Sequence, residues 1–120
     1  LDLSSLRYAM NAGEPIRLAT IEKFEQKFGV PGAIRPGYGL SEANGVTNLG
    51  VGESLRFDSA GNIGCGRAAD GLTLEIVDND GRQLGHGFTG EIRLRGDQVF
   101  AGYCDDETAT QEKLRDGWFY

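Results

Sequence analysis

The chain has 120 residues, of which 39% are hydrophobic and 25% charged, and its formal net charge at pH 7 is −6. This apolar fraction is that of a folded domain, and the net negative charge argues against a nucleic-acid partner, which basic residues would have to attract. No stretch approaches the roughly 18 consecutive apolar residues of a membrane-spanning helix, so no membrane span is expected.

Residues 1–50 predict an α/β piece of β-α-β type. An apolar run at residues 6–10 is typical of a strand, and the asparagine, glycine and proline that follow it indicate a loop. An amphipathic helix comes next, because apolar residues recur every three or four positions: Leu18, Ile21, Phe24 and Phe28. We expect Thr20 to cap this helix and Gly29 to end it, with a short second strand at residues 33–35.

Residues 51–120 predict a second piece, an antiparallel β-barrel-like segment. Apolar and polar residues alternate in two stretches, which is the pattern of half-buried strands. The expected elements are strands at residues 72–76 and 92–94, a tight turn at 78–81, a helix from the acidic run at 105 to about 114, and an aromatic strand at 118–120.

Three patterns resemble ligand sites but are interpreted as structural. The sequence Gly64–Ala69 matches the relaxed dinucleotide fingerprint GxGxxA, yet it follows a loop and precedes a strand, whereas that fingerprint needs a helix after it. Asp78–Gly81 lacks the ligand spacing of a calcium loop, so we interpret it as a hairpin turn. The three acids at Asp105–Glu107 are interpreted as a solvated helix cap rather than a metal site.

The few cysteines and the single histidine argue against several kinds of metal and catalytic site. Cys65 and Cys104 form no CxxC pair, which is typical of reduced thiols in a cytoplasmic protein, although one disulfide between them stays open. His86 is the single histidine, which argues against a histidine-based metal site or a Ser-His-Asp triad within the chain.

The sequence Gly37–Glu42, which reads GYGLSE, combines what a nucleotide-phosphate site needs. Its glycines let the backbone approach a ligand closely, and Tyr38 offers a flat face on which a base can stack. Ser41 supplies a hydroxyl toward a phosphate or a developing oxyanion, and Glu42 is a hard oxygen ligand of the kind Mg²⁺ prefers. We expect this bend to converge with a second one at residues 11–16, because both would follow neighbouring strands at the carboxyl edge of the sheet.

Taken in order, these segments resemble the adenylate-forming superfamily, essentially end to end and most like an acyl-CoA synthetase. Residues 38–42 are similar to its Tyr-Gly-x-Thr/Ser-Glu motif, and residues 12–15 to its glycine-containing adenine loop. Further matches are similar to its β-barrel segments and to the lead-in of its Thr-Gly-Asp motif: residues 63–67, 90–96 and 100–103, and then 116–120. On that resemblance Gly90, Glu91, Gly102 and Tyr103 are chiefly structural.

The resemblance implies an ATP-dependent ligase that converts a carboxylic acid into an acyl-adenylate and passes the acyl group to a thiol, with CoA as the acceptor. By similarity, Ser41 and Glu42 are the catalytic pair, with Ser41 on the α-phosphate of ATP and Glu42 on Mg²⁺. The adenine of ATP or AMP would lie between Tyr38–Gly39 and the loop Gly13, Glu14 and Pro15.

Several parts of the family pattern are not in these 120 residues, namely the lysine-bearing phosphate loop, the Asp of Thr-Gly-Asp and the C-terminal catalytic lysine. We therefore expect an internal piece of a longer enzyme, inactive in adenylation by itself, whose partners are the missing N-terminal and C-terminal parts. A fatty-acyl-AMP ligase or a peptide-synthetase adenylation domain stays open within the class. A non-catalytic, glycine-rich β interaction module stays open outside it.

Overall fold

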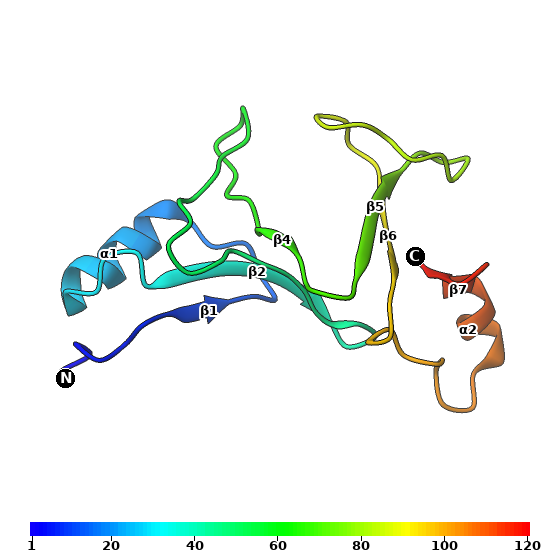
Figure 1. The fold of residues 1–120 in the computed structure, drawn as a ribbon, viewed down its shortest axis with the longest axis horizontal. Helices are drawn as coiled ribbons and strands as arrows, with labels where there is room; N and C mark the ends of the chain where they lie inside the picture. Colours follow the sequence, from blue (N-terminus) through cyan, green and yellow to red (C-terminus); the bar gives the residue numbers. More distant parts are fainter. The chain divides into compact units, whose positions relative to one another are not determined.

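The computed structural model describes all residues from Leu1 to Tyr120, and their contacts divide them into two compact units. The first unit comprises Leu1–Leu40 and Gly45–Ala69, and the second comprises Ser41–Asn44 and Asp70–Tyr120. Two four-stranded sheets form the framework (Figure 1). Neither helix is long and apolar enough to cross a membrane.

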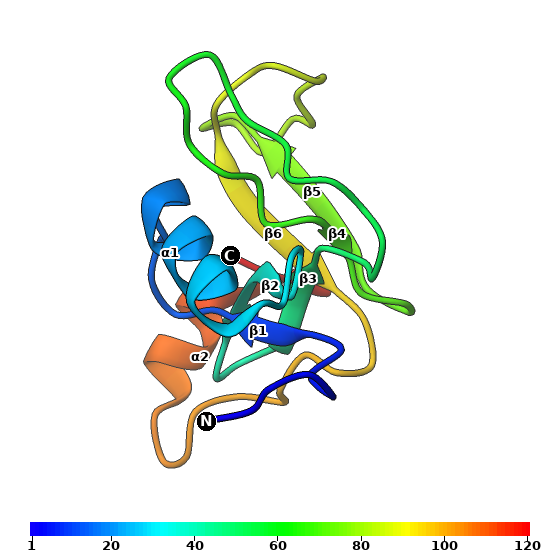
Figure 2. The same cartoon turned by 90° about the vertical axis from the view of Figure 1, so that its left-hand side faces the viewer.

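The predicted β-α-β arrangement is confirmed in the first unit. Strand β1 (Ala9–Asn11) and strand β2 (Ile34–Leu40) pair in parallel, and helix α1 (Leu18–Phe28) connects them. The helix lies along one side of this strand pair (Figures 1 and 2) and buries Ile21 from its apolar stripe. A parallel pair requires such a crossover, so the helical period in the sequence and the strand pairing support each other.

Of the two residues predicted to bound α1, the one at its C-terminal end is confirmed and the one at its N-terminal end is wrong. Gly29 ends the helix as expected, in the left-handed conformation at φ 66°, and its N–H donates to the carbonyl of Glu25. Thr20 is not the cap, because the helix begins earlier and Arg17 occupies the N-cap position without a side-chain hydrogen bond. The backbone N–H of Thr20 instead donates to the carbonyl of Arg17 within the first turn.

Strand β2 is longer than predicted and continues to Leu40, so Gly37–Leu40 form part of a strand rather than a bend. The chain is tightly packed at Gly37, where a Cβ would lie 2.8 Å from the carbonyl oxygen of Thr47 and 2.5 Å from the Met10 methyl group. Only a glycine allows the strand to pass through this gap. The bend itself begins at Ser41, and the turn through Ala43 leads into β3 (Asn44–Asn48).

Strand β4 (Arg67–Ala68) pairs antiparallel with β3 and completes the first sheet. No helix follows the Gly64–Ala69 sequence, which supports its interpretation as structural. By their contacts these residues belong to the first unit. Gly66 has φ +86°, and a Cβ there would overlap the backbone of Asn48 and Leu49.

The second unit contains the predicted antiparallel sheet, which is open rather than closed into a barrel. Strand β5 (Thr73–Val77) pairs with β6 (Glu91–Arg95), and β8 (Trp118–Phe119) lies between β6 and β7 (Leu114–Arg115). The buried apolar residues of the second unit are Ala43, Leu72, Val77, Leu94 and Phe119. Helix α2 (Glu107–Lys113) starts where the acidic run predicted, and the carboxylate of its N-cap Asp106 accepts the N–H of Ala109.

Arg93 of β6 makes several polar contacts on this sheet. We expect Arg93→Met to lower the melting temperature of the chain by several degrees. Its guanidinium bonds the Glu75 carboxylate at 2.6 Å and the Tyr120 hydroxyl at 3.2 Å, and stacks on the Trp118 ring at 4.3 Å. Losing the Arg93 guanidinium leaves the mostly buried Glu75 carboxylate without its charged partner, which destabilises the fold.

A matched control for Arg93→Met is Arg82→Met. The Arg82 pair with Asp80 is exposed to solvent, and such surface pairs contribute little to stability. Thermal unfolding followed by circular dichroism should therefore separate the two variants. Equal melting temperatures would contradict the structural role of Arg93.

Candidate functional site

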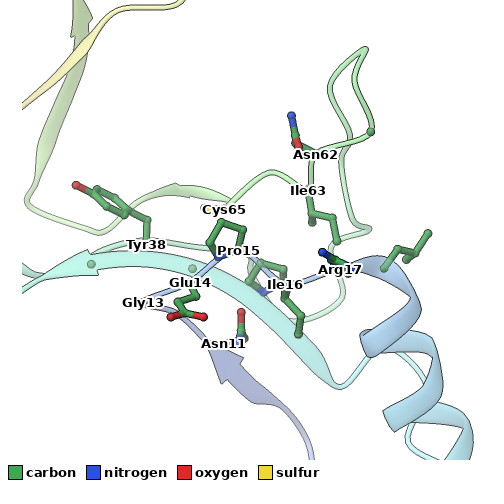
Figure 3. A pocket seen from close by; sticks show the side chains of 15 residues that line it. Asn11, Gly13, Glu14, Pro15, Ile16, Arg17, Tyr38, Asn62, Ile63 and Cys65 are labelled. Carbon is green, nitrogen blue, oxygen red and sulfur yellow. The ribbon is translucent and has the colours of Figure 1, made fainter.

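A pocket of about 770 Å³ opens in the first unit (Figure 3). Three segments of the chain line it: residues 11 and 13–18, from the end of β1 to the start of α1; residues 36–39 of β2; and residues 61–63 with 65 from the loop before β4. Because Asn11 lies opposite Pro36 in the parallel pair, the loop after β1 emerges beside the second half of β2. The register of the strands therefore brings two of the three walls together.

The five predicted adenine-site residues all line this pocket: Gly13, Glu14, Pro15, Tyr38 and Gly39. Gly13 has φ +89°, a conformation that favours glycine, and the turn it makes leads into the exposed Glu14 and Pro15. The half-buried Tyr38 side chain and the Pro15 ring lie above β2 on the same side (Figure 3). A tyrosine face and a proline ring are surfaces on which a flat heterocycle can pack.

The third wall of the pocket was not predicted from the sequence, and it contains Asn62, Ile63 and Cys65. Asp58 organises this loop, because its carboxylate accepts the N–H groups of Ala60 and Asn62 and the side-chain amide of Asn62. The bond from the Asn62 side chain is the main cause that lowers the pKa of Asp58. An Asp four residues before an Asn is a weak signal for such a loop, and nothing in the pattern indicates that it lines a pocket.

The pocket lining also includes Asn11 and Ile16, which belong to the predicted bend at residues 11–16, and Arg17 and Leu18, which lie outside the prediction. Arg17 and Glu14 are the charged side chains of the lining, and both are exposed. A neutral flat ring would therefore meet mainly apolar and amide groups, with one charge of each sign at the margin.

Ser41 and Glu42 lie in the turn between β2 and β3, which belongs to the second unit, and they are not part of the pocket lining. Glu42 is half-buried, and its Oε1 accepts a hydrogen bond of 2.7 Å from the Tyr103 hydroxyl. This bond is the first cause that lowers the pKa of Glu42, and it also raises the pKa of Tyr103. The Glu42 side chain is thus a carboxylate at neutral pH, while Ser41 is exposed beside it.

The chemistry of this turn fits a magnesium ion held mainly by a nucleotide. Nowhere in the structure do three or more His, Cys, Asp or Glu side chains gather into a metal cluster. Mg²⁺ does not require one, because it is commonly held by one or two carboxylates together with substrate phosphates and water. Glu42 offers one ionised carboxylate, and Tyr103 engages one of its two oxygens.

Comparison with known proteins now identifies the family. The family model described as "AMP-binding enzyme" matches residues 1–104, so the chain belongs to the AMP-binding enzyme family. A rice protein, 4-coumarate–CoA ligase 3 from Oryza sativa subsp. japonica, is 33% identical over 122 residues, covering 99% of this chain and 22% of its own length. The long-chain-fatty-acid–CoA ligase of Yersinia pestis is 36% identical over 118 residues, covering 98% of this chain and 20% of its own length.

A solved structure supports the same relationship at the level of the fold. The structure of McyG A-PCP complexed with phenylalanyl-adenylate superposes with a TM-score of 0.78 and 26% sequence identity, covering 98% of this chain and 20% of that one. The chain thus spans about a fifth of the length of these two CoA ligases. The predicted fold class, part of an adenylate-forming enzyme, is confirmed.

Proposed function

We propose that this chain forms the nucleotide-contacting part of an ATP-dependent ligase, which activates a carboxylic acid as acyl-AMP and transfers the acyl group to the thiol of CoA. The observation that carries the proposal is the pocket in which Gly13–Pro15 meet Tyr38 and Gly39. Relatives named as CoA ligases support both the acid activation and the thiol acceptor. Membership of an enzyme family disfavours the alternative of a non-catalytic interaction module.

In this proposal each predicted residue has a separate task. Tyr38 and Pro15 pack against the two faces or edges of the adenine, and Gly13 lets the loop approach it without a side chain in the way. The Ser41 hydroxyl donates to the α-phosphate, where negative charge must be shielded while the acid attacks. Glu42 holds Mg²⁺, which supplies positive charge to the phosphates when it is bound.

The identity of the acyl acceptor distinguishes the alternatives within the class. A fatty-acyl-AMP ligase or a peptide-synthetase adenylation domain would pass the acyl group to a carrier protein instead of CoA, and the likeness to McyG A-PCP keeps that acceptor open. We favour CoA because the named relatives are CoA ligases. We further propose a cytoplasmic location, which the two free, exposed cysteines support.

The test is a titration of the isotope-labelled chain with AMP, followed by backbone amide shifts. We expect the changes to cluster at residues 13–16, 37–39 and 62–65, because these segments form the pocket. Tyr38→Ala should weaken binding by about tenfold, the scale of one lost base–aromatic stack. Tyr8→Ala, at an exposed tyrosine outside the pocket, is the control and should bind AMP normally. Shifts confined to other surfaces would contradict the nucleotide assignment.

A further inference from the structure

We propose that Tyr103 is a positioning residue for Glu42: its hydroxyl fixes the carboxylate of the 41–43 turn in the orientation in which that carboxylate meets the magnesium ion of the nucleotide. The inference rests on the proposed function, because it assigns a task to the turn that carries Ser41 and Glu42. It also changes the role of Tyr103, which the family resemblance treats as chiefly structural.

The turn is held by three hydrogen bonds from one short segment of the second unit, residues 98–103. The Tyr103 hydroxyl donates to the Glu42 carboxylate at 2.7 Å. The Phe100 N–H donates to the Glu42 carbonyl at 2.7 Å, and the Gln98 side-chain amide donates to the Ala43 carbonyl at 2.7 Å. Two of these bonds fix the backbone of the turn, and the bond from Tyr103 holds the Glu42 side chain.

Contacts other than the one with Glu42 also hold Tyr103 in place. Its N–H donates to the Thr110 hydroxyl at 2.9 Å, and its ring packs edge-on against Phe100 at 4.8 Å between centroids. Phe100 in turn packs against the buried Phe119 of β8 at 5.7 Å. The ring therefore stays fixed without help from Glu42, so the hydroxyl is a preorganised donor.

The chemistry explains why such a donor is useful beside a metal ligand. A half-exposed glutamate has three rotatable side-chain bonds, and holding it in one geometry costs conformational entropy. A hydroxyl that donates to Oε1 restricts these rotations and leaves the second oxygen available for the ion. Groups that orient metal ligands in this way typically change metal affinity or activity by about 10- to 100-fold when they are removed.

The experiment compares Tyr103→Phe with the unchanged sequence in the complete ligase. Phenylalanine keeps the ring that packs on Phe100 and removes only the hydroxyl. We expect the Mg²⁺ concentration for half-maximal ATP–pyrophosphate exchange to rise about tenfold or more, with little change in the KM of the carboxylic acid. Tyr8→Phe, at an exposed tyrosine of the first unit, should leave the Mg²⁺ dependence unchanged.

A direct binding measurement adds a readout independent of turnover. The paramagnetic relaxation enhancement of Mn²⁺ with a non-hydrolysable ATP analogue should show weaker metal binding in Tyr103→Phe by a similar factor. In a Glu42→Gln background, the same substitution should have no further effect, because the hydroxyl acts only through that carboxylate. A loss of equal size in both backgrounds, or unchanged Mn²⁺ binding in Tyr103→Phe, would overturn the proposal.

The outcomes also separate this inference from the proposed function. If Glu42→Gln weakens Mn²⁺ binding and Tyr103→Phe does not, Glu42 keeps its proposed role and the positioning role of Tyr103 fails. If neither variant changes Mn²⁺ binding while both remain folded, the assignment of Glu42 to the metal fails, and the inference falls with it.

Discussion

If the proposed function holds, replacement of Glu42 by glutamine in the complete protein is expected to slow ATP–pyrophosphate exchange by about a thousandfold. Glutamine is nearly isosteric and can still accept the hydrogen bond from Tyr103, so the turn should keep its geometry. It loses the negative charge, however, and with it the ability to hold a divalent cation against the phosphates. Removing one preorganised group from a site where charge develops typically costs about 10²- to 10³-fold in rate.

The matched control is Glu22→Gln, which removes the same charge from an exposed position on α1. It should leave the exchange rate unchanged, and both variants should melt within a few degrees of the unchanged protein. An active Glu42→Gln enzyme would show that Mg²⁺ is held elsewhere, and would remove Glu42 from the catalytic pair.

The substitution Gly66→Ala is expected to destabilise the first unit by roughly 3 kcal/mol or more, which is at or above the upper end of the usual range for single substitutions. Two costs add at this position. The backbone has φ +86°, where a side chain is strained, and a Cβ would overlap the carbonyl group of Asn48. The obstacle is backbone rather than a flexible side chain, so the strand pair β3–β4 must separate to relieve the overlap.

Urea unfolding of the chain measures this loss, and Gly85→Ala provides the comparison. A Cβ at Gly85 would meet no atom within 4 Å and the residue has no positive φ, so alanine should be tolerated there within about 0.5 kcal/mol. Because Cys65 lines the pocket next to Gly66, the Gly66→Ala variant should also bind AMP more weakly. Similar urea midpoints for the two variants would contradict the close approach of the chain segments at Gly66.

Elements whose stability is local could be predicted from the sequence. The spacing of apolar residues located α1, because a helix buries one stripe whatever its surroundings. Gly29 and Asp106 marked helix ends through their own backbone and side-chain chemistry. Alternation located β5 and β6, and the turn at residue 78 follows from the Asp78 carboxylate, which accepts the N–H groups of Asp80 and Arg82.

Features that depend on distant residues could not be predicted. The extension of β2 through Gly37 has no local signal, because proline and glycine are poor strand formers, and packing against Met10 and Thr47 decides it. The third wall of the pocket comes from a loop some two dozen residues after β2, with no periodic pattern. The hydrogen bond from Tyr103 to Glu42 joins residues that are 61 positions apart, so only the folded chain reveals it.

The hydrogen bond from the Phe100 amide to the Glu42 carbonyl couples the opening of the 41–43 turn to fraying of the second sheet. The Phe100 ring packs on Phe119 of β8, so fraying of that strand would loosen the donor and free the turn together. Deuterium uptake at the Phe100 amide therefore reports the free energy of the local opening that breaks this bond to the turn. Destabilising changes in β8 would lower that free energy of opening even though they lie far from Glu42 in the sequence.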